Sequence, residues 1–256
     1  LGVFFCKENT LFNNAEIKFF DEEDIELAYK LSDTNQSFVL YDENKFKGLI
    51  IFRYKFYDER TILDILDKTD CILITSLQEI NKIYFNGYIF TNNGKYWECK
   101  YPLEFYINQI RKSIPELNST IIEIINFAFY ILSPNKTGAT IVYWFSDLSR
   151  KEINNIKTFK NESLNVNNKS DITALRNLIK ETDGAIFINK NGNFINYGIH
   201  LTYSNKSKKE IKTDHSTGTR HNSAKKYSYD HKNCLIITVS EDGPVTIFSN
   251  GVDIIK

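Results

Sequence analysis

Apolar and polar positions follow two patterns along this chain, and both are clearest in the C-terminal half. The apolar run Thr120–Leu132 spans thirteen residues, interrupted only by Glu123 and Asn126, and predicts a buried helix over 119–132. Ala139–Phe145 is almost continuously apolar, as expected of a strand in a sheet that is buried on both faces. Over 170–182 the apolar side chains recur every three or four residues, which predicts a helix with one buried stripe.

The remaining C-terminal elements follow from short apolar runs that Gly, Asn and Pro turns separate. These runs predict four further strands and the start of another helix, at 186–189, 194–201, 234–240, 245–248 and 218–224. The lysine-rich stretch 206–212 is interpreted as a loop, and the polar segment 147–169 as a helix followed by an exposed loop. Helices that alternate with strands indicate an α/β fold.

The N-terminal part of the chain predicts a second, smaller domain of α/β or α+β type. Its pattern predicts two helices, three strands and a hairpin, at 21–31, 61–68, 38–41, 48–54, 71–75 and 83–100. Asn92-Asn93-Gly94 supplies the hairpin turn between strands 83–91 and 96–100, because Asn-Gly favours positive φ. A last helix is expected between Pro102 and Pro115. We place the boundary within 100–118, between an N-terminal domain, 1–115, and a C-terminal domain, 116–256.

Length and charge narrow the class of protein. A chain of 256 residues can form one or two domains with a substantial core, and 42% apolar residues exclude wholesale disorder. The 32 basic and 32 acidic residues cancel, but unevenly: residues 1–115 hold 14 basic against 18 acidic side chains, and the rest hold 18 against 14. This asymmetry indicates two halves with different partners and gives no whole-chain signal for polyanion binding.

Cysteine spacing and hydropathy point to the compartment. Cys6, Cys71, Cys99 and Cys234 are widely scattered, with no CxxC pair and no histidine at metal-ligand spacing. We therefore expect no zinc site and four free thiols in a reducing cytoplasm. The longest apolar run is shorter than the ~20 residues of a transmembrane helix, so no membrane association is expected. No secretory signal is expected at the N-terminus either.

The segment 217–224 carries the sharpest chemical signal. Gly218 lets a ligand approach the backbone, Thr219 offers a hydroxyl, and His221 adds a donor. Arg220 is one of only six arginines in the chain, and its planar guanidinium suits phosphate. These residues open a helix, where unsatisfied N–H groups favour anions. Residues 201–232 hold eight basic and three acidic side chains. An exposed basic loop that only caps a helix remains an alternative interpretation.

Two groups of carboxylates stand beside predicted strands. Asp183 ends a helix and directly precedes Gly184-Ala185 and a strand, so it falls at a sheet edge where ligands of α/β proteins bind. A carboxylate at a helix C-terminus opposes the macrodipole, and a metal ion or a function would compensate it. Ser240-Glu241-Asp242 lies at the end of another strand. Taken alone, each group is more often just an ordinary turn.

Taken together, these motifs resemble the diadenylate cyclase (DAC) domain family. The resemblance rests on Asp183-Gly184-Ala185, then Gly218-Thr219-Arg220-His221, then Val239-Ser240-Glu241, in this order and spacing. The flanking segments 138–142 and His200-Leu201 agree with it, and it covers roughly residues 119–256. It implies a C-terminal domain with a central mixed β-sheet flanked by helices.

The resemblance also implies an activity, the condensation of two ATP molecules into cyclic di-AMP with release of two pyrophosphates. It implies a homodimer or higher homo-oligomer through the catalytic domains and a requirement for Mg²⁺ or Mn²⁺. Asp183 would lie near the metal and the 3′-hydroxyl, and Asp183, Arg220 and His221 would form the catalytic set. Further roles are implied in ATP binding for Gly184, Ala185, Leu201, Gly218, Thr219 and Ser240, and in metal binding for Glu241.

One departure from the family pattern leaves a second function open. A second basic residue usually follows the His, and this chain has Asn222. Loss of one charge-assisted phosphate contact costs ~1.5–3 kcal/mol. Lys225, Lys226 or a loop lysine could compensate, or the chain could be a nucleotide-binding sensor without turnover. A nucleic-acid-binding module is a weaker alternative, because the aromatic residues follow apolar strand patterns. The N-terminal domain resembles no family, and regulation or assembly is expected of it.

Overall fold

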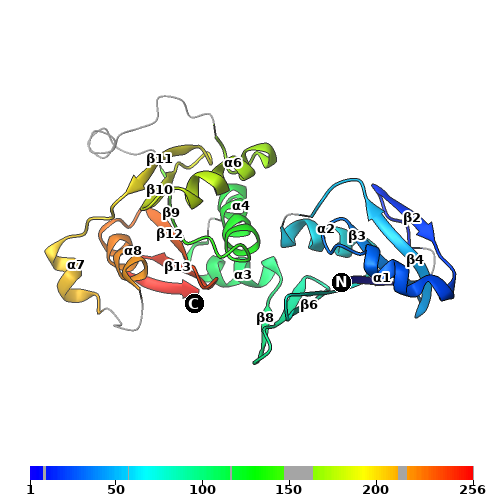
Figure 1. The fold of residues 1–256 in the computed structure, drawn as a ribbon. Coiled ribbons are helices and arrows are strands. Elements are labelled where there is room, and N and C mark those ends of the chain that lie inside the picture. Colours follow the sequence, from blue (N-terminus) through cyan, green and yellow to red (C-terminus); the bar gives the residue numbers. More distant parts are fainter. Residues whose placement is uncertain (8–9, 57, 116, 147–163, 213–217, 256) are drawn as a thin grey trace. The chain divides into compact units, whose positions relative to one another are not determined.

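The computed structural model describes residues 1–7, 10–56, 58–115, 117–146, 164–212 and 218–255. The chain divides into two compact units, Leu1–Phe105 and Tyr106–Lys256. Each unit contains a mixed β-sheet with helices, as shown in Figure 1. The mixed α/β architecture expected from the sequence is confirmed.

The first unit is built on a sheet in which eight strands are described. Their order is β2-β4-β3-β1-β5-β6-β7-β8, with β1 and β3 parallel and the other pairs antiparallel. The strands are β1 (Gly2–Cys6), β2 (Ala15–Phe19), β3 (Ser37–Asp42), β4 (Lys45–Phe52), β5 (Ile72–Leu77), β6 (Ile80–Phe85), β7 (Tyr88–Asn92) and β8 (Trp97–Lys100). Of these, β1 and β2 were not predicted.

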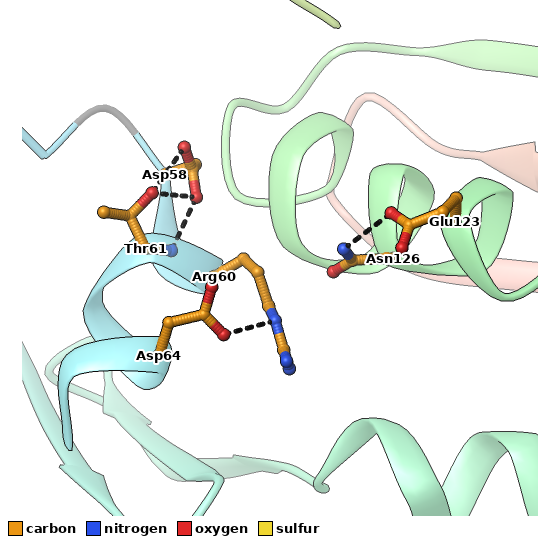
Figure 2. Close-up of polar contacts among 6 residues, drawn as sticks. All are labelled: Asp58, Arg60, Thr61, Asp64, Glu123 and Asn126. Carbon is orange, nitrogen blue, oxygen red and sulfur yellow. Dashed lines mark hydrogen bonds and ion pairs between the residues drawn. The ribbon is translucent and has the colours of Figure 1, made fainter. Parts of the chain in front are cut away.

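Two helices pack on this sheet, and each begins with acidic residues. The first is α1 (Ile25–Leu31), which follows a 3-10 turn (Glu22–Asp24) and buries Ala28. The second is α2 (Glu59–Thr69), where the Asp58 side chain accepts a hydrogen bond from the Thr61 backbone N–H at 2.8 Å. Figure 2 shows this cap, and it also shows the ion pair between Arg60 and Asp64, which lies one helical turn after Arg60. Carboxylates at a helix N-terminus satisfy free N–H groups there.

Two predictions for the first unit were wrong. Residues 83–91 are not one strand, because Asn86 and Gly87 both adopt positive φ, 48° and 79°, and turn the chain between β6 and β7. Cys6 and Cys71 are not free thiols but form a disulfide between the ends of β1 and β5. Cys99 and Cys234 are not part of a disulfide. The two half-cystines lie 65 residues apart in sequence, so only the antiparallel pairing of these strands brings them together.

The second unit contains a sheet with the described order β11-β10-β9-β12-β13-β14. Only β9 and β10 are parallel neighbours. The strands are β9 (Ala139–Trp144), β10 (Ala185–Ile188), β11 (Phe194–Ile199), β12 (Cys234–Val239), β13 (Val245–Ser249) and β14 (Val252–Ile255). All six residues of β9 are buried, which confirms the predicted two-sided burial. The last strand, β14, was not predicted.

Helices cover both faces of this sheet. The helices are α3 (Leu103–Ser113), α4 (Ser119–Asn126), α6 (Lys169–Lys180), α7 (Asn205–Glu210) and α8 (Thr219–Asp230). Helix α8 packs on β12, β13 and β14, and its buried Ala224 and Tyr227 join a core with Val142, Phe187 and Ile236. Figure 1 shows α8 over this part of the sheet.

The second unit departs from the sequence predictions in two segments. The predicted helix 119–132 begins as α4 but continues as a π-helix over Phe127–Leu132. At the end of α4, the Asn126 side chain donates a hydrogen bond to the Glu123 carboxylate (Figure 2). The lysine-rich stretch expected to be a loop forms α7, because Ser204 caps its first turn by accepting from the Ser207 N–H. Residues 147–163 of the predicted helix and loop lie outside the described residues. None of the described helices combines the length and apolar character needed to cross a membrane.

Candidate functional site

The motifs singled out in the sequence meet at one end of the strands of the second sheet, where β9 and β10 begin and β11 and β12 finish. This end of the sheet is called the edge. Ala185 of β10 pairs with Thr140 of β9 and with Ile199 of β11. Val239, at the end of β12, pairs with Ala139 at the start of β9. The Asp183 motif, the segment after β11 and the Ser240-Glu241 turn therefore share this edge. It is formed by the N-terminal ends of β9 and β10, so Asp183 precedes its strand rather than following one.

A close backbone contact holds the Asp183 motif at the edge. Gly184 has φ +104°, and a Cβ on it would lie 2.7 Å from the Gly198 carbonyl carbon and 2.9 Å from the Ile199 nitrogen. Gly198 itself has φ +68° within β11. A glycine at 184 is thus required both by conformation and by space. The preceding Asp183 is exposed, and within the described residues its carboxylate has no hydrogen-bond or ion-pair partner.

Arg220 lies at the same edge and contacts the end of β12. Its Nη1 donates to Glu241 Oε1 at 3.0 Å, and the two side chains are 42% and 75% exposed. A Cβ on Gly138, which directly precedes β9, would lie 2.3 Å from Arg220 Nη1 and 2.8 Å from Glu241 Cγ. The missing side chain at Gly138 therefore makes room for this ion pair. Sequence reasoning did not include Gly138 among the site residues, although a glycine directly before a buried strand is a usable signal.

The N-terminus of α8 presents the other predicted phosphate ligands. Gly218 is the N-cap residue of the helix, has an extended conformation and, as a glycine, offers no side chain to cap the first turn. Thr219 is exposed, and the half-buried His221 packs edge-on against Phe248 with ring centroids 4.6 Å apart. Packing of the His221 ring on a fully buried residue fixes its position. The helix start thus combines the N–H groups of a first turn with an imidazole that packing holds in place, a suitable arrangement for binding an anion.

Apolar and turn residues complete the edge. Leu201 is half-buried and packs against the core beneath α8, as does Ile199. Ser240 is exposed in a tight turn, in which its N–H donates to Pro244 O and its carbonyl accepts from Gly243 N, both at 2.9 Å. The turn fixes the backbone that carries Ser240 and Glu241. An apolar side chain beside exposed polar groups is typical of a small-molecule site.

Across the edge, the predicted residues form two groups. Arg220, Glu241 and Gly138 touch one another, whereas Asp183 precedes β10, which lies two strand positions away from β12. Two strand spacings place the start of β10 about 10 Å from the end of β12. Sequence reasoning missed Gly198, which packs on Gly184; a glycine inside a strand is a known sign of close backbone approach.

The carboxylates fit a hard divalent cation that a ligand's phosphates would share. No cluster of three or more His, Cys, Asp or Glu side chains able to hold a metal alone occurs in the described parts of the chain. Mg²⁺ is typically bound by one or two carboxylates together with substrate phosphates. The unpaired Asp183 and the exposed Glu241 meet that description.

A family model decides which family this arrangement belongs to. The model, DAC, described as the nucleotide-binding domain of the DisA bacterial checkpoint controller, matches residues 127–252. This stretch is a DAC domain. The match includes β9 to β13 and every predicted site residue, so the resemblance seen in the motifs is confirmed.

Two solved structures are similar to parts of this chain at low sequence identity. One is titled a hypothetical membrane-spanning protein from Bacillus cereus, at 22% identity and a TM-score of 0.40, covering 58% of this chain and 69% of that one. The other is a double cysteine mutant of DacA from Staphylococcus aureus, at 18% identity and a TM-score of 0.37, covering 60% and 88%. A search of curated proteins finds no match to this sequence.

Proposed function

We propose that this chain is a diadenylate cyclase, which condenses two ATP molecules into cyclic di-AMP and releases two pyrophosphates. The observation that carries the proposal is the meeting of Arg220, Glu241, Gly138 and the Asp183 motif at one edge of a DAC domain. In each half of the reaction a 3′-hydroxyl oxygen attacks an α-phosphorus, and the bond from that phosphorus to the β-phosphate oxygen breaks. The hydroxyl proton is lost, and pyrophosphate takes the electron pair.

The product requires two sites that face each other. Each ATP must present its 3′-hydroxyl to the α-phosphate of the other, which a single site cannot arrange. We therefore propose a homodimer, or a higher homo-oligomer, in which two catalytic domains hold their nucleotides antiparallel. The exposed edge described above supplies the surface for this contact. Catalysis then depends mainly on positioning and on stabilisation of charge.

Asp183 is proposed to act on the 3′-hydroxyl. Its carboxylate is exposed at the edge and unpaired within the described structure, so it is available to accept a hydrogen bond from that hydroxyl. A base in this position assists the loss of the hydroxyl proton. Gly184 and Ala185 carry no bulky side chains, which leaves room for the nucleotide beside the carboxylate.

The phosphates are proposed to bind at the start of α8. Gly218 and Thr219 offer backbone N–H groups and a hydroxyl, and Arg220 and His221 offer side-chain donors. In this structure Arg220 Nη1 is paired with Glu241, and we propose that a phosphate displaces this carboxylate from the guanidinium. The pair is largely exposed, and exposed ion pairs contribute only about 0–1 kcal/mol, so the exchange costs little.

The exchange also provides a metal ligand. Glu241, once released from Arg220, is proposed to join Asp183 in holding Mg²⁺ or Mn²⁺ together with phosphate oxygens. When bound, the cation neutralises charge on the transferred and leaving phosphates. Ser240, in the turn before Glu241, is placed to contact a phosphate. Leu201, which packs on the core beside β10, is placed to pack against adenine.

The proposed activity has consequences outside the catalytic edge. Because the substrate is ATP, we propose that the enzyme acts in the cytoplasm. The first unit, in which no catalytic residue is proposed, is assigned a regulatory or assembly role. We propose no role in nucleic-acid binding, since a core of aromatic residues in the first unit, among them Phe4, Phe38 and Phe52, is buried and packs against itself.

The test is direct. The full chain is incubated with ATP and either Mn²⁺ or Mg²⁺, and the nucleotides are separated by chromatography. We expect cyclic di-AMP, and we expect Asp183→Asn to abolish it while the circular dichroism spectrum stays unchanged. Absence of the product from the wild-type reaction with both metals, or unchanged turnover in Asp183→Asn, contradicts the proposal.

A second candidate function follows from Asn222. This residue replaces the basic residue expected after His221, and its loss of positive charge favours a nucleotide-binding sensor without turnover. The sensor binds ATP or cyclic di-AMP in calorimetry but forms no product during long incubation. Detection of product excludes it.

A further inference from the structure

Two lysine side chains outside the proposed site converge on one aromatic ring. Lys226 Nζ, from α8, lies 4.9 Å from the ring centroid of Tyr203, and Lys208 Nζ, from α7, lies 5.7 Å from the same centroid. Tyr203 belongs to the segment that connects β11 to α7, two residues after Leu201. A cation is attracted to the face of a ring, but two ammonium groups at one ring repel each other.

Among the residues that the structure describes, no carboxylate forms an ion pair with either of these ammonium groups. The adjacent Lys225, in contrast, is bound to Asp253 at 2.7 Å. The nearby acidic side chains have other partners, since Glu210 accepts from the Tyr229 hydroxyl. An unbalanced cationic pair on a half-buried ring is an arrangement that an anion would stabilise.

Asp230, at the end of α8, holds the pair in place. It accepts hydrogen bonds from the Ser204 N–H at 2.6 Å, the Ser204 hydroxyl at 2.8 Å and the Ser207 hydroxyl at 3.0 Å. Burial raises the pKa of Asp230, but these hydrogen bonds outweigh it, and the pKa lies below its ordinary value. The carboxylate therefore stays ionised and ties the start of α7 to α8, which fixes Tyr203 and Lys208 beside Lys226.

Helical geometry connects this pair to the proposed phosphate site. Thr219, Asn222 and Lys226 are spaced by three and four residues in α8, so they lie on one face of the helix. Side chains on a helix point toward its N-terminus, which directs the Lys226 ammonium back toward Asn222 and Thr219. Lys226 therefore lies on the face of α8 that begins with Thr219, whereas Lys208 reaches the Tyr203 ring from α7.

We propose that Lys226 and Lys208, held around Tyr203, bind the terminal phosphates of the nucleotide and supply the positive charge that Asn222 lacks. This inference rests on the proposed function, because it assumes a triphosphate whose α-phosphate lies near Arg220. Of the lysines that the sequence offered as replacements for the missing basic residue, the structure favours Lys226. It argues against Lys225, because Asp253 neutralises the charge of Lys225.

The experiment compares nucleotides that differ in their terminal phosphates. The full chain and the variants Lys226→Gln and Lys208→Gln are titrated with ATP and with AMP in a calorimeter. We expect each variant to bind ATP about tenfold more weakly, as for one lost charge-assisted contact, and to bind AMP as the wild type does. Lys209→Gln is the matched control, since Lys209 is exposed on α7 beside Lys208 but is not one of the two lysines at the Tyr203 ring. Melting curves confirm that each variant is folded.

The outcomes separate this inference from the proposed function. Three results overturn the inference and leave the proposed cyclase activity untouched. They are an unchanged ATP affinity in both lysine variants, an equal weakening of ATP and AMP binding, and an equal weakening of ATP binding in Lys209→Gln. Inorganic pyrophosphate is titrated as a second probe. If the wild type binds pyrophosphate but not ATP, and Lys226→Gln loses that binding, the result supports the anion site at the two lysines and contradicts the proposed cyclase activity. If the wild type binds neither ATP nor pyrophosphate, both are overturned.

Discussion

Arg220 of α8 donates to Glu241 at the end of β12 across 3.0 Å, and Gly138 leaves the space in which the two side chains meet. The guanidinium proposed to bind phosphate is thus already paired with a carboxylate, and the carboxylate proposed to hold a metal is paired with the guanidinium. Each group keeps the other's charge balanced until a nucleotide and a cation arrive together. Binding of the two ligands is therefore expected to be cooperative.

Glu241→Gln tests this exchange by separating binding from turnover. Loss of the competing carboxylate frees Arg220, so ATP affinity measured without divalent metal is expected to rise by up to about fivefold, the upper limit for an exposed ion pair. Turnover with metal is expected to fall, because one ligand of the cation is lost. Calorimetry with EDTA and a product assay with Mn²⁺ provide the two measurements. A variant that binds ATP more weakly without metal contradicts the exchange.

Gly184 and Gly198 form a matched pair for testing the backbone contact beside Asp183. Gly184→Ala places a Cβ 2.7 Å from backbone at φ +104°, so the free energy of unfolding is expected to fall by more than the ~1–3 kcal/mol of a strained residue. Gly198→Ala meets no atom closer than 3.6 Å and is expected to cost only ~1–2 kcal/mol. Urea denaturation measures both values. Equal losses in the two variants would mean that the close approach at Gly184 does not limit substitution.

The disulfide of the first unit predicts a thiol count. Titration of denatured protein with Ellman's reagent is expected to find two free thiols, those of Cys99 and Cys234, and four after reduction. Cys71→Ser is expected to lower the free energy of unfolding by about 2–4 kcal/mol, because the bond closes a long loop. Four thiols before reduction in freshly purified protein contradict the pairing.

A buried carboxylate in the first unit predicts acid sensitivity. Glu59 of α2 is 5% exposed and lies 2.7 Å from Lys82 Nζ and 2.5 Å from Lys100 Nζ. Burial raises its pKa, but attraction to Lys100 and Lys82 outweighs burial, so the pKa lies below the ordinary 4.5. A carboxyl with a depressed folded-state pKa stabilises the fold above its unfolded pKa, and this stabilisation is lost as pH falls through the folded value.

Glu59→Gln removes that stabilisation at every pH. The variant is expected to lose about 3–5 kcal/mol at pH 7, because two poorly exposed lysines are left without a partner. Its stability should also fall less steeply than that of the wild type below pH 4.5. Urea denaturation between pH 3 and pH 7 measures both effects. Parallel pH profiles for the two proteins would exclude Glu59 as a source of acid sensitivity.

The sequence predicted elements best where burial imposes a continuous pattern. Strand β9 lies between two neighbours and is buried on both faces, so its apolar run identified it correctly. Strand β2 alternates apolar and polar residues but was not predicted, because it has only five residues and none of them is buried. Strands β6 and β7 were merged because the turn was placed at Asn92-Asn93-Gly94 alone, although Asn86-Gly87 is a second Asn-Gly turn between two short apolar runs. Helix α7 is polar throughout, and only Ser204 at its cap marked it.

Candidate site residues were predictable where side-chain chemistry was unusual, and not where function depends on space or pairing. Arg220 stood out as a rare arginine at a helix start. Gly138 and Gly198 act through the absence of a side chain; their positions before and inside a strand are a signal, but the atoms that occupy the space are known only from the structure. The disulfide of Cys6 with Cys71 depends on strand order in the first sheet, and the contact of Lys226 with Tyr203 depends on how α7 docks on α8.

The most direct measurement of the central claim is the stoichiometry of the reaction with ATP. The full chain is incubated with ATP and Mn²⁺, and cyclic di-AMP and pyrophosphate are quantified over the same time course. The account predicts two pyrophosphates for each cyclic di-AMP, with no product from Asp183→Asn. ATP that binds without forming cyclic di-AMP, or pyrophosphate released without it, would contradict the account.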